Sequence, residues 1–306
     1  MKSGTRRRYG GRGLASQNAV YVIGAGGRSG APLCRALLGL DIPVIPVLRD
    51  AARLPADIAS RALPPRIADL TGPEASLRAA LAGAGYVIST AHASHIPALL
   101  RAAAPETVLI GLGSTRKFTR WPDAHGNGVL RGERALLDSG RAAMLLHPTM
   151  IYGPQGEDNV QRLASLLRRL PLVPLPGGGR ALVQPIHQDD VTRSLVAALG
   201  LAQSGRLTQP QSLVIAGPQA VSYRDFAGAV ARAAGFAMPP VIPVPAQLLM
   251  AAAPFLRWLP GVPKVGRNEI RRLLEDKAFD IGPMQTTLSV TPIPLEEGLR
   301  GLFARN

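Results

Sequence analysis

Short apolar runs alternate with helix-forming segments along the first half of the chain. Strands that alternate with helices at this spacing predict a parallel sheet with helices on both faces. The runs that we interpret as strands are residues 19–23, 44–48, 66–68, 85–89, 107–112 and 143–146. The segments that we interpret as helices are residues 32–40, 75–81, 96–104 and 132–139.

The pattern changes after residue 147. Segments rich in proline and glycine, at 171–179, 239–245 and 254–263, separate shorter helices, and the strand-like run 212–216 is expected to rejoin the main sheet. The predicted fold is therefore α/β, a doubly wound parallel sheet of Rossmann type with a smaller C-terminal substrate lobe. We assign residues 18–150 to the main domain, which the chain re-enters at about 187–216, and residues 151–186 and 217–306 to the lobe.

A glycine-rich turn, Gly24-Ala25-Gly26-Gly27-Arg28-Ser29-Gly30, connects the first predicted strand to the first predicted helix. In such a turn the first glycine permits a sharp exit from the strand, and the second allows close approach of a pyrophosphate. The third allows the helix to pack on the sheet. The helix then directs its N-terminal amides at the phosphates. This context predicts a nicotinamide dinucleotide site; the alternative is a tight turn without a ligand.

The end of the second strand bears on the choice of cofactor. An acid there would hydrogen-bond the ribose 2′-hydroxyl of NAD, whereas an arginine would accept the 2′-phosphate of NADP. Arg49 is the first residue past the strand, with Asp50 behind it, and Arg28 is a second cation inside the glycine turn. These residues favour NADP(H), with NAD(H) as the alternative. Asp69, after the third strand, is placed to meet the adenine ring or to cap the next helix.

Composition narrows the classes of partner. The 306 residues carry a formal charge of +15, yet no recognition element or interleaved aromatic pattern accompanies it, so we expect an anionic small molecule rather than nucleic acid. The single cysteine, Cys34, excludes an internal disulfide and favours the cytoplasm. Residues 1–17 are interpreted as a disordered basic leader, and the apolar stretch 241–256 contains three prolines and is too short for a membrane span. Both a monomer and a homodimer are compatible with the sequence.

Several motifs in order resemble the short-chain dehydrogenase/reductase superfamily, in its extended or atypical epimerase/dehydratase-like branch. The resemblance covers about residues 18 to 304. It is carried by the glycine turn, by Gly113-Ser114-Thr115 at the end of the fifth strand, and by the segments 147–154 (HPTMIYGP) and 184–191 (QPIHQDDV). The closing stretch, with EDK at 275–277 and LEEGL at 295–299, is also typical of that branch.

The resemblance implies a catalytic serine or threonine after the fifth strand, followed by a Tyr-x-x-x-Lys pair. Ser114, or Thr115 beside it, fits the first role, but no Tyr-x-x-x-Lys occurs in the sequence. The tyrosine position falls near His125, which could exchange a proton because its reference pKa is about 6.5. The alternative reading places His125 in a solvated, glycine-rich loop at 125–128.

The resemblance also implies further binding residues. Tyr152 is expected either to contact the substrate or to pack under Pro154, and Arg180 to stand in for the pyrophosphate-binding arginine that Val183 replaces. Asp189 and Asp190 are expected to cap a helix, and His187 to serve a structural role. We predict no metal site. The remaining residues expected at the cofactor are Leu70, Thr90, Ala91, His147, Pro148 and Thr149.

Two functions therefore remain open from the sequence. The first is an NAD(P)(H)-dependent oxidoreductase or epimerase/dehydratase-type enzyme, which acts on a carbonyl or hydroxyl group of a small, possibly sugar-derived molecule held between sheet and lobe. The second is a non-catalytic dinucleotide-binding sensor or assembly protein that lost the Tyr/Lys pair. The fold alone does not decide between them.

Overall fold

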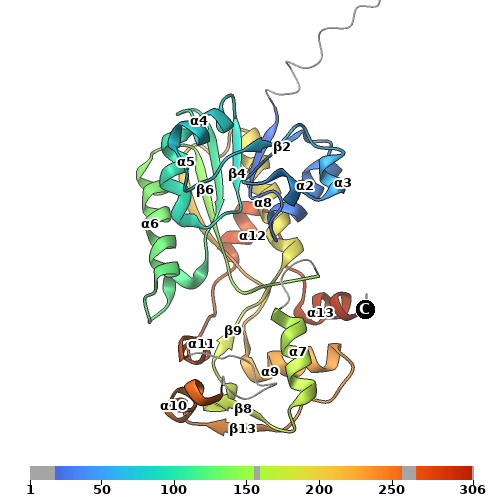
Figure 1. Cartoon of the computed structure of the whole chain (residues 1–306). Coiled ribbons are helices and arrows are strands. Elements are labelled where there is room, and N and C mark those ends of the chain that lie inside the picture. Colours follow the sequence, from blue (N-terminus) through green and yellow to red (C-terminus); the bar gives the residue numbers. More distant parts are fainter. Residues whose placement is uncertain (1–17, 155–158, 257–266, 305–306) are drawn as a thin grey trace, which may run out of the picture.

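The computed structural model describes residues 18–154, 159–256 and 267–304. The predicted leader at 1–17 lies outside the described residues. A parallel sheet of seven strands, in the order β11-β6-β5-β4-β1-β2-β3, forms its centre (Figure 1). Its strands are β1 (Val20–Ile23), β2 (Val44–Leu48), β3 (Arg66–Ile67), β4 (Tyr86–Ser89), β5 (Val108–Leu112), β6 (Ala143–Pro148) and β11 (Pro210–Ile215).

The strand order confirms the predicted fold class. From β3 to β6 it runs 3-2-1-4-5-6, the order of doubly wound dinucleotide-binding sheets, in which the order reverses between β1 and β4. The run predicted at 212–216 is found as β11, paired with β6 at the sheet edge. The domain boundaries given above stay a prediction.

Alternating side chains of the strands build two cores. Val20 and Val22 face α2 and α8, whereas Tyr21 and Ile23 face the layer of α4, α5 and α6. Cys34 is fully buried in the first core, and burial raises its pKa to about 12, so it acts as a small apolar residue. The helices of these layers are α2 (Gly30–Gly39), α3 (Ala56–Ala59), α4 (Glu74–Leu81), α5 (Ile96–Ala102), α6 (Ala124–Asp138), α8 (Gln188–Gln203) and α12 (Gly282–Leu288).

The helix predicted at 132–139 begins eight residues earlier, so the loop predicted at 125–128 is wrong. Asp123 caps α6 by accepting a hydrogen bond from the backbone nitrogen of Gly126 (2.8 Å). Glycines lower helix propensity, which concealed this part of the helix. They are needed for close packing, because a side chain at Gly132 would overlap the carbonyl oxygen of Ala93.

The expected caps of α8 are also wrong. His187 caps this helix through Nδ1, which accepts a hydrogen bond from the backbone nitrogen of Asp189 (3.2 Å). Asp190 is fully buried in the first turn, where it pairs with Arg193 and accepts a hydrogen bond from the backbone nitrogen of Ile293 (2.9 Å). A buried carboxylate needs such partners, and Asp190 thereby fastens a C-terminal segment to α8.

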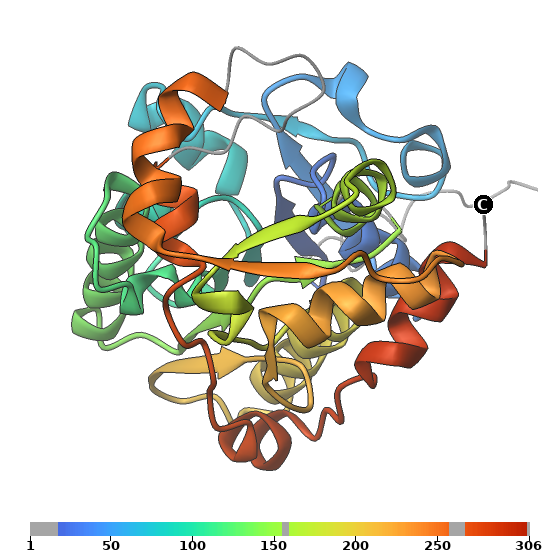
Figure 2. The same cartoon turned by 90° about the horizontal axis from the view of Figure 1, so that it is seen from below.

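The remaining elements lie together apart from the main sheet, and Figure 2 shows β13 alongside β8. Two small apolar cores join most of them, and the larger core contains Tyr152, Phe226 and Leu299. The strands are β7 (Ile151–Tyr152), β8 (Val173–Pro176), β9 (Leu182–Val183), β10 (Ile186–His187), β12 (Val221–Ser222) and β13 (Val241–Val244). The helices are α7 (Asn159–Arg169), α9 (Tyr223–Ala233), α10 (Ala246–Leu256), α11 (Arg267–Arg272) and α13 (Leu295–Phe303). Short 3₁₀ turns are η1 (Ala51–Arg53), η2 (Ala93–His95), η3 (Thr115–Phe118) and η4 (Gly177–Gly179).

Candidate functional site

The glycine turn passes directly from β1 into α2. Gly24 has φ +79°, a left-handed conformation, and a Cβ there would lie 2.8 Å from Oγ1 of Thr90. A Cβ at Gly30 would overlap the carbonyl oxygen of Gly24. The turn is thus closed by contacts that only glycine permits.

The N-terminus of α2 is open to a negatively charged ligand. Its cap residue, Ser29, makes no capping hydrogen bond, and the first turn contains no acidic residue. The hydroxyl of Ser29 points instead to Oε1 of Gln188 (3.5 Å). In the first turn of α2 the backbone nitrogen of Ala31 donates to the carbonyl oxygen of Gly27 (3.0 Å) and Pro32 has no N–H, so the amide of Gly30 is the one suited to a phosphate oxygen.

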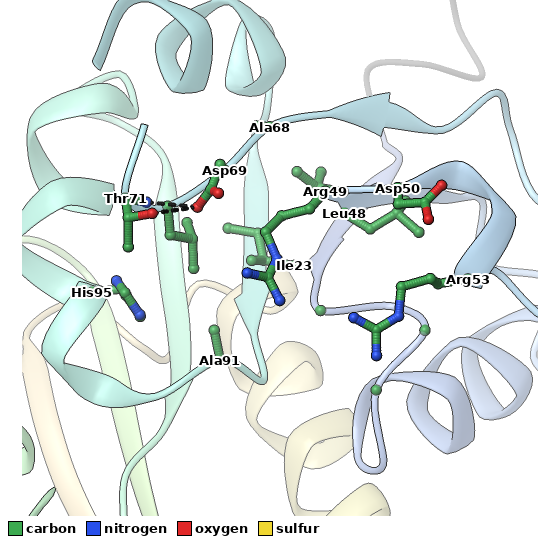
Figure 3. Close-up of a pocket in the computed structure, with 15 residues that line it drawn as sticks. Ile23, Leu48, Arg49, Asp50, Arg53, Ala68, Asp69, Thr71, Ala91 and His95 are labelled. Carbon is green, nitrogen blue, oxygen red and sulfur yellow. Dashed lines mark hydrogen bonds between the residues drawn. The ribbon is translucent and has the colours of Figure 1, made fainter. Parts of the chain in front are cut away.

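A cavity of about 360 Å³ lies beside this turn, at the carboxyl ends of β1, β2 and β3 (Figure 3). Arg49 and Arg53 direct their guanidinium groups into it. The predicted residues that line it are Gly24, Gly26, Gly27, Arg49, Asp69, Leu70 and Ala91. Lining residues that the sequence analysis did not propose are Ile23, Val47, Leu48, Asp50, Arg53, Ala68, Thr71 and His95.

The two carboxylates of this cavity, Asp50 and Asp69, both accept hydrogen bonds from nearby residues. Asp50 caps the short turn η1 by accepting a hydrogen bond from the backbone nitrogen of Ala52 (2.9 Å). Asp69 accepts hydrogen bonds from the backbone nitrogen (2.9 Å) and the hydroxyl (2.8 Å) of Thr71. These bonds, the backbone one first, lower the pKa of Asp69. Both carboxylates are thus engaged by the backbone.

Ser114 lies where β5 ends and η3 begins. Its Oγ accepts a hydrogen bond from the backbone nitrogen of Arg116 (3.1 Å), which leaves the hydroxyl proton available to another acceptor. The neighbouring Thr115 donates its hydroxyl proton to the carbonyl oxygen of Pro148 (3.2 Å). Of the two candidates, Ser114 therefore has the freer donor.

A buried polar network lies beneath Ser114. Nδ1 of His147 accepts a hydrogen bond from the backbone nitrogen of Ser114 (3.1 Å), so the ring carries its proton on Nε2. Nε2 lies 3.0 Å from Oγ of Ser212 and 3.2 Å from Oε1 of Glu133, which also pairs with Lys117. A side chain at Gly113 would overlap the His147 ring.

Burial sets the charge states in this network. Burial, followed by the charge of Lys117, lowers the pKa of His147 to about 4, so its ring is neutral at pH 7. Burial alone would raise the pKa of Glu133, but hydrogen bonds from Lys117 and Ser212 override it and lower that pKa. Lys117 and Glu133 thus form a largely buried ion pair next to a neutral imidazole.

A second cavity, of about 370 Å³, contains Ser114 and Thr115 in its wall. The loop after β5 forms one side and residues 272–279 another. The two sides are joined where Oε1 of Glu275 accepts hydrogen bonds from Oγ1 of Thr119 (2.8 Å) and the backbone nitrogen of Arg120 (2.6 Å). The rings of Phe118 and Phe279 lie 5.5 Å apart across the same junction.

Comparison with known proteins is informative at the level of structure. No protein-family model and no curated protein matches the sequence. A nucleoside-diphosphate-sugar epimerase from Staphylococcus aureus superposes with a TM-score of 0.71 at 16% identity, covering 92% of this chain and 99% of that one. An NADPH-dependent quinone oxidoreductase from Escherichia coli, complexed with NADPH, gives 0.71 at 17% identity, covering 93% and 99%.

A third solved structure is similar over the same length. It is UDP-glucuronic acid 4-epimerase from Bacillus cereus in complex with UDP-glucuronic acid and NAD, with a TM-score of 0.67 at 18% identity, covering 94% of this chain and 99% of that one. The chain has the fold of the short-chain dehydrogenase/reductases. The likeness spans both the sheet and the elements beyond it, and at these identities it concerns the fold.

Some predicted cofactor residues lie outside the cavity beside the glycine turn. Arg28 is exposed on the turn, and Thr90 donates its hydroxyl proton to the carbonyl oxygen of Ile23 (3.0 Å). The His147 side chain is fully buried in the network described above. The others that do not line this cavity are Ser29, Gly30, Pro148 and Thr149.

The candidate acid His125 lies in the first turn of α6 with an exposed side chain. Its ring packs edge-to-face on His92, with the ring centres 4.3 Å apart. Desolvation, followed by the charge of Arg116, lowers the pKa of His125. His125 lines neither of the two cavities described above.

Neither of the two predicted substrate residues lines the cavity that contains Ser114. The Tyr152 side chain is fully buried, with its ring 5.2 Å from that of His187, and its hydroxyl has no partner among the described residues. Arg180 lines a separate hollow with Ser222 and Arg224. Nothing in the proline- and glycine-rich segment before Arg180 indicated that this residue would line a separate hollow.

The described residues offer neither a metal site nor a membrane-spanning helix. Within the described ranges, no cluster of histidine, cysteine, aspartate or glutamate side chains is suited to hold a metal ion. Across the same ranges, no helix is long and apolar enough to cross a membrane.

Proposed function

We propose that this chain binds a nicotinamide dinucleotide, NADP(H) in preference to NAD(H), and acts as an oxidoreductase or epimerase-type enzyme on a carbonyl or hydroxyl group of a small molecule. The observation that carries the proposal is the cavity beside the glycine turn, into which Arg49 and Arg53 point (Figure 3). The uncapped N-terminus of α2 supports it independently. The fold shared with NADPH- and NAD-bound enzymes agrees with it.

The preference for NADP(H) rests on charge. Arg49 and Arg53 are two cations at the end of β2, where the adenosine ribose lies in this class of fold. Asp50, the residue that could receive a ribose hydroxyl, accepts a backbone hydrogen bond in η1. A 2′-phosphate would therefore meet two guanidinium groups.

The chemistry would divide between cofactor and protein. The nicotinamide, when bound, supplies or accepts the hydride. Ser114 lines the second cavity and has a hydroxyl proton to donate, so it would hydrogen-bond the substrate oxygen. The network through His147 holds the Ser114 backbone in place for that contact. The smaller C-terminal elements would cover the substrate, in keeping with the predicted lobe.

The buried cysteine and the proposed cofactor also bear on the cellular compartment. We propose a cytoplasmic protein, since the single cysteine is buried and the cofactor belongs to metabolism. The oligomeric state is left between monomer and homodimer.

Fluorescence titration with NADPH and NADH tests the cofactor. Arg49→Gln and Arg53→Gln should each weaken NADPH binding roughly 10- to 100-fold, the worth of one charge-assisted contact, and leave NADH binding nearly unchanged. Gly27→Asp should abolish binding of both, because its carboxylate would repel the phosphates. Arg134→Gln, an exposed arginine elsewhere on α6, is the matched control.

The outcomes separate the two functions. If neither dinucleotide binds at millimolar concentration, the proposal is wrong. If NADPH binds but a panel of aldehydes, ketones and quinones never consumes it, the chain is a dinucleotide-binding sensor instead. Consumption that Ser114→Ala reduces at unchanged NADPH affinity supports the enzyme.

A further inference from the structure

The second cavity carries an excess of positive charge. Its wall contains four cationic side chains, Arg116, Arg120, Arg272 and Lys277, and two acidic residues next to one another. Arg116 is paired with Asp123 outside the wall (Nε to Oδ2, 2.8 Å). The remaining cations come from two segments far apart in the sequence that meet only in the folded chain.

The two acidic residues of the wall already accept hydrogen bonds from backbone nitrogens. Oε1 of Glu275 accepts hydrogen bonds from the hydroxyl of Thr119 and from the backbone nitrogen of Arg120. Oδ1 of Asp276 receives the backbone nitrogen of Leu182 (2.9 Å). Their hydrogen bonds hold residues 275–277 in place, so these two carboxylates are already partly satisfied.

Lys277 is held through both its backbone and its side chain. Its backbone nitrogen donates to the carbonyl oxygen of Leu182 (2.9 Å), and Nζ donates to the carbonyl oxygen of Arg272 (3.4 Å). Burial lowers the pKa of Lys277; the charges of Arg272 and Arg116 add to this, and Glu275 opposes it. An anion beside Nζ would relieve this cost.

Thr149 provides an independent sign of a ligand. It lines the same cavity and is 7% exposed, and its Oγ1 has no hydrogen-bond partner among the described residues. A buried hydroxyl without a partner costs about 1–3 kcal/mol. An acceptor oxygen inside the cavity would satisfy it.

We propose that this cavity binds a compact oxyanion, a carboxylate or phosphate group of the substrate, through Lys277, Arg272 and Thr149. The substrate is then an acidic carbonyl or hydroxyl compound. The volume of about 370 Å³ lies near the lower end of small-molecule sites, which suits a compact ligand. We assign the anion to the substrate because Ser114 lines the same cavity, and this assignment rests on the proposed function. The existence of the anion site does not depend on that function.

Calorimetric titration of the full chain with inorganic phosphate, and separately with succinate, tests this site at constant ionic strength. Each titration is run with and without saturating NADPH. Lys277→Met and Thr149→Val should weaken the binding roughly tenfold or more, the worth of one contact to a charged group. Thr149→Val removes a hydroxyl without a partner, so it keeps the fold. Arg232→Gln, an exposed arginine paired with Glu296, is the matched control and should change nothing.

The pattern of results identifies the anion and the site. Tighter binding of phosphate indicates a phosphomonoester substrate, and tighter binding of succinate a carboxylic acid. No binding of either anion overturns the proposal, as does binding that both variants leave unchanged. If NADPH displaces the phosphate and Lys277→Met leaves phosphate binding unaffected, the phosphate occupies the cavity beside the glycine turn. That result also overturns the proposal. Binding that depends on Lys277 in a chain that fails to bind NADPH upholds the anion site and contradicts only the proposed function.

Discussion

Nδ1 of His147 accepts a 3.1 Å hydrogen bond from the backbone nitrogen of Ser114. This bond joins the end of β6 to the end of β5, next to the Ser114 hydroxyl that we propose to contact the substrate. We therefore interpret the histidine as a positioning residue within the core, since its side chain does not reach either cavity.

Removal of this acceptor should be costly. His147→Ala leaves the backbone nitrogen of Ser114 unpaired and opens a void, so we expect the free energy of unfolding to fall by about 3 kcal/mol. His147→Asn places an amide oxygen near the position of Nδ1 and should recover part of this loss. Urea unfolding of the three proteins measures it. Equal stability of the alanine and asparagine variants would contradict the role of the bond.

His147 should also make stability depend on pH. The folded chain keeps the ring neutral down to its pKa of about 4, whereas the unfolded chain takes up a proton near pH 6.5. Stabilisation is thus complete above about pH 6.5 and falls by about 3 kcal/mol as the pH drops to about 4. The difference in unfolding free energy between the wild type and His147→Asn should shrink over this range. A constant difference would exclude the linkage.

Two glycines offer a matched test of packing. Gly132→Ala should destabilise the chain by several kcal/mol, because its Cβ would overlap the carbonyl oxygen of Ala93 and push α6 away from η2. Gly200→Ala, inside α8 with no atom within 4 Å of its Cβ, should be neutral or stabilise by up to about 1 kcal/mol. Thermal unfolding of both variants gives the comparison. Similar melting temperatures would show that α6 can shift.

Tyr152→Phe tests the expectation that Tyr152 contacts the substrate. The hydroxyl is buried without a partner among the described residues, so its loss should leave stability unchanged or raise it by about 1 kcal/mol. NADPH affinity and turnover should also stay the same, because the ring packs on His187 away from both cavities. A loss of turnover at unchanged stability would restore the substrate role.

The sequence alone determined the strands of the main sheet and their order along the chain. Runs such as 44–48 are apolar at every position, because a central parallel strand is buried on both faces, and this local signal gave β2 at its observed bounds. The glycine turn was largely local as well, since a Cβ at Gly27 or Gly30 would meet the carbonyl oxygen of Gly24 within the same turn. Helix α6 was misjudged because its glycines lower the local propensity while a distant contact, to Ala93, requires them.

Only the tertiary structure decided which polar residues meet. Arg53 reaches the cavity beside the glycine turn because η1 turns the chain back over that turn, and Lys277 reaches the wall beside Ser114 through a backbone pairing with Leu182. His147 reads in the sequence as a residue of the cofactor loop, yet its side chain points into the core. Strand periodicity reports burial along one segment, whereas a site is assembled from several segments whose distances are fixed by the packing of the whole chain.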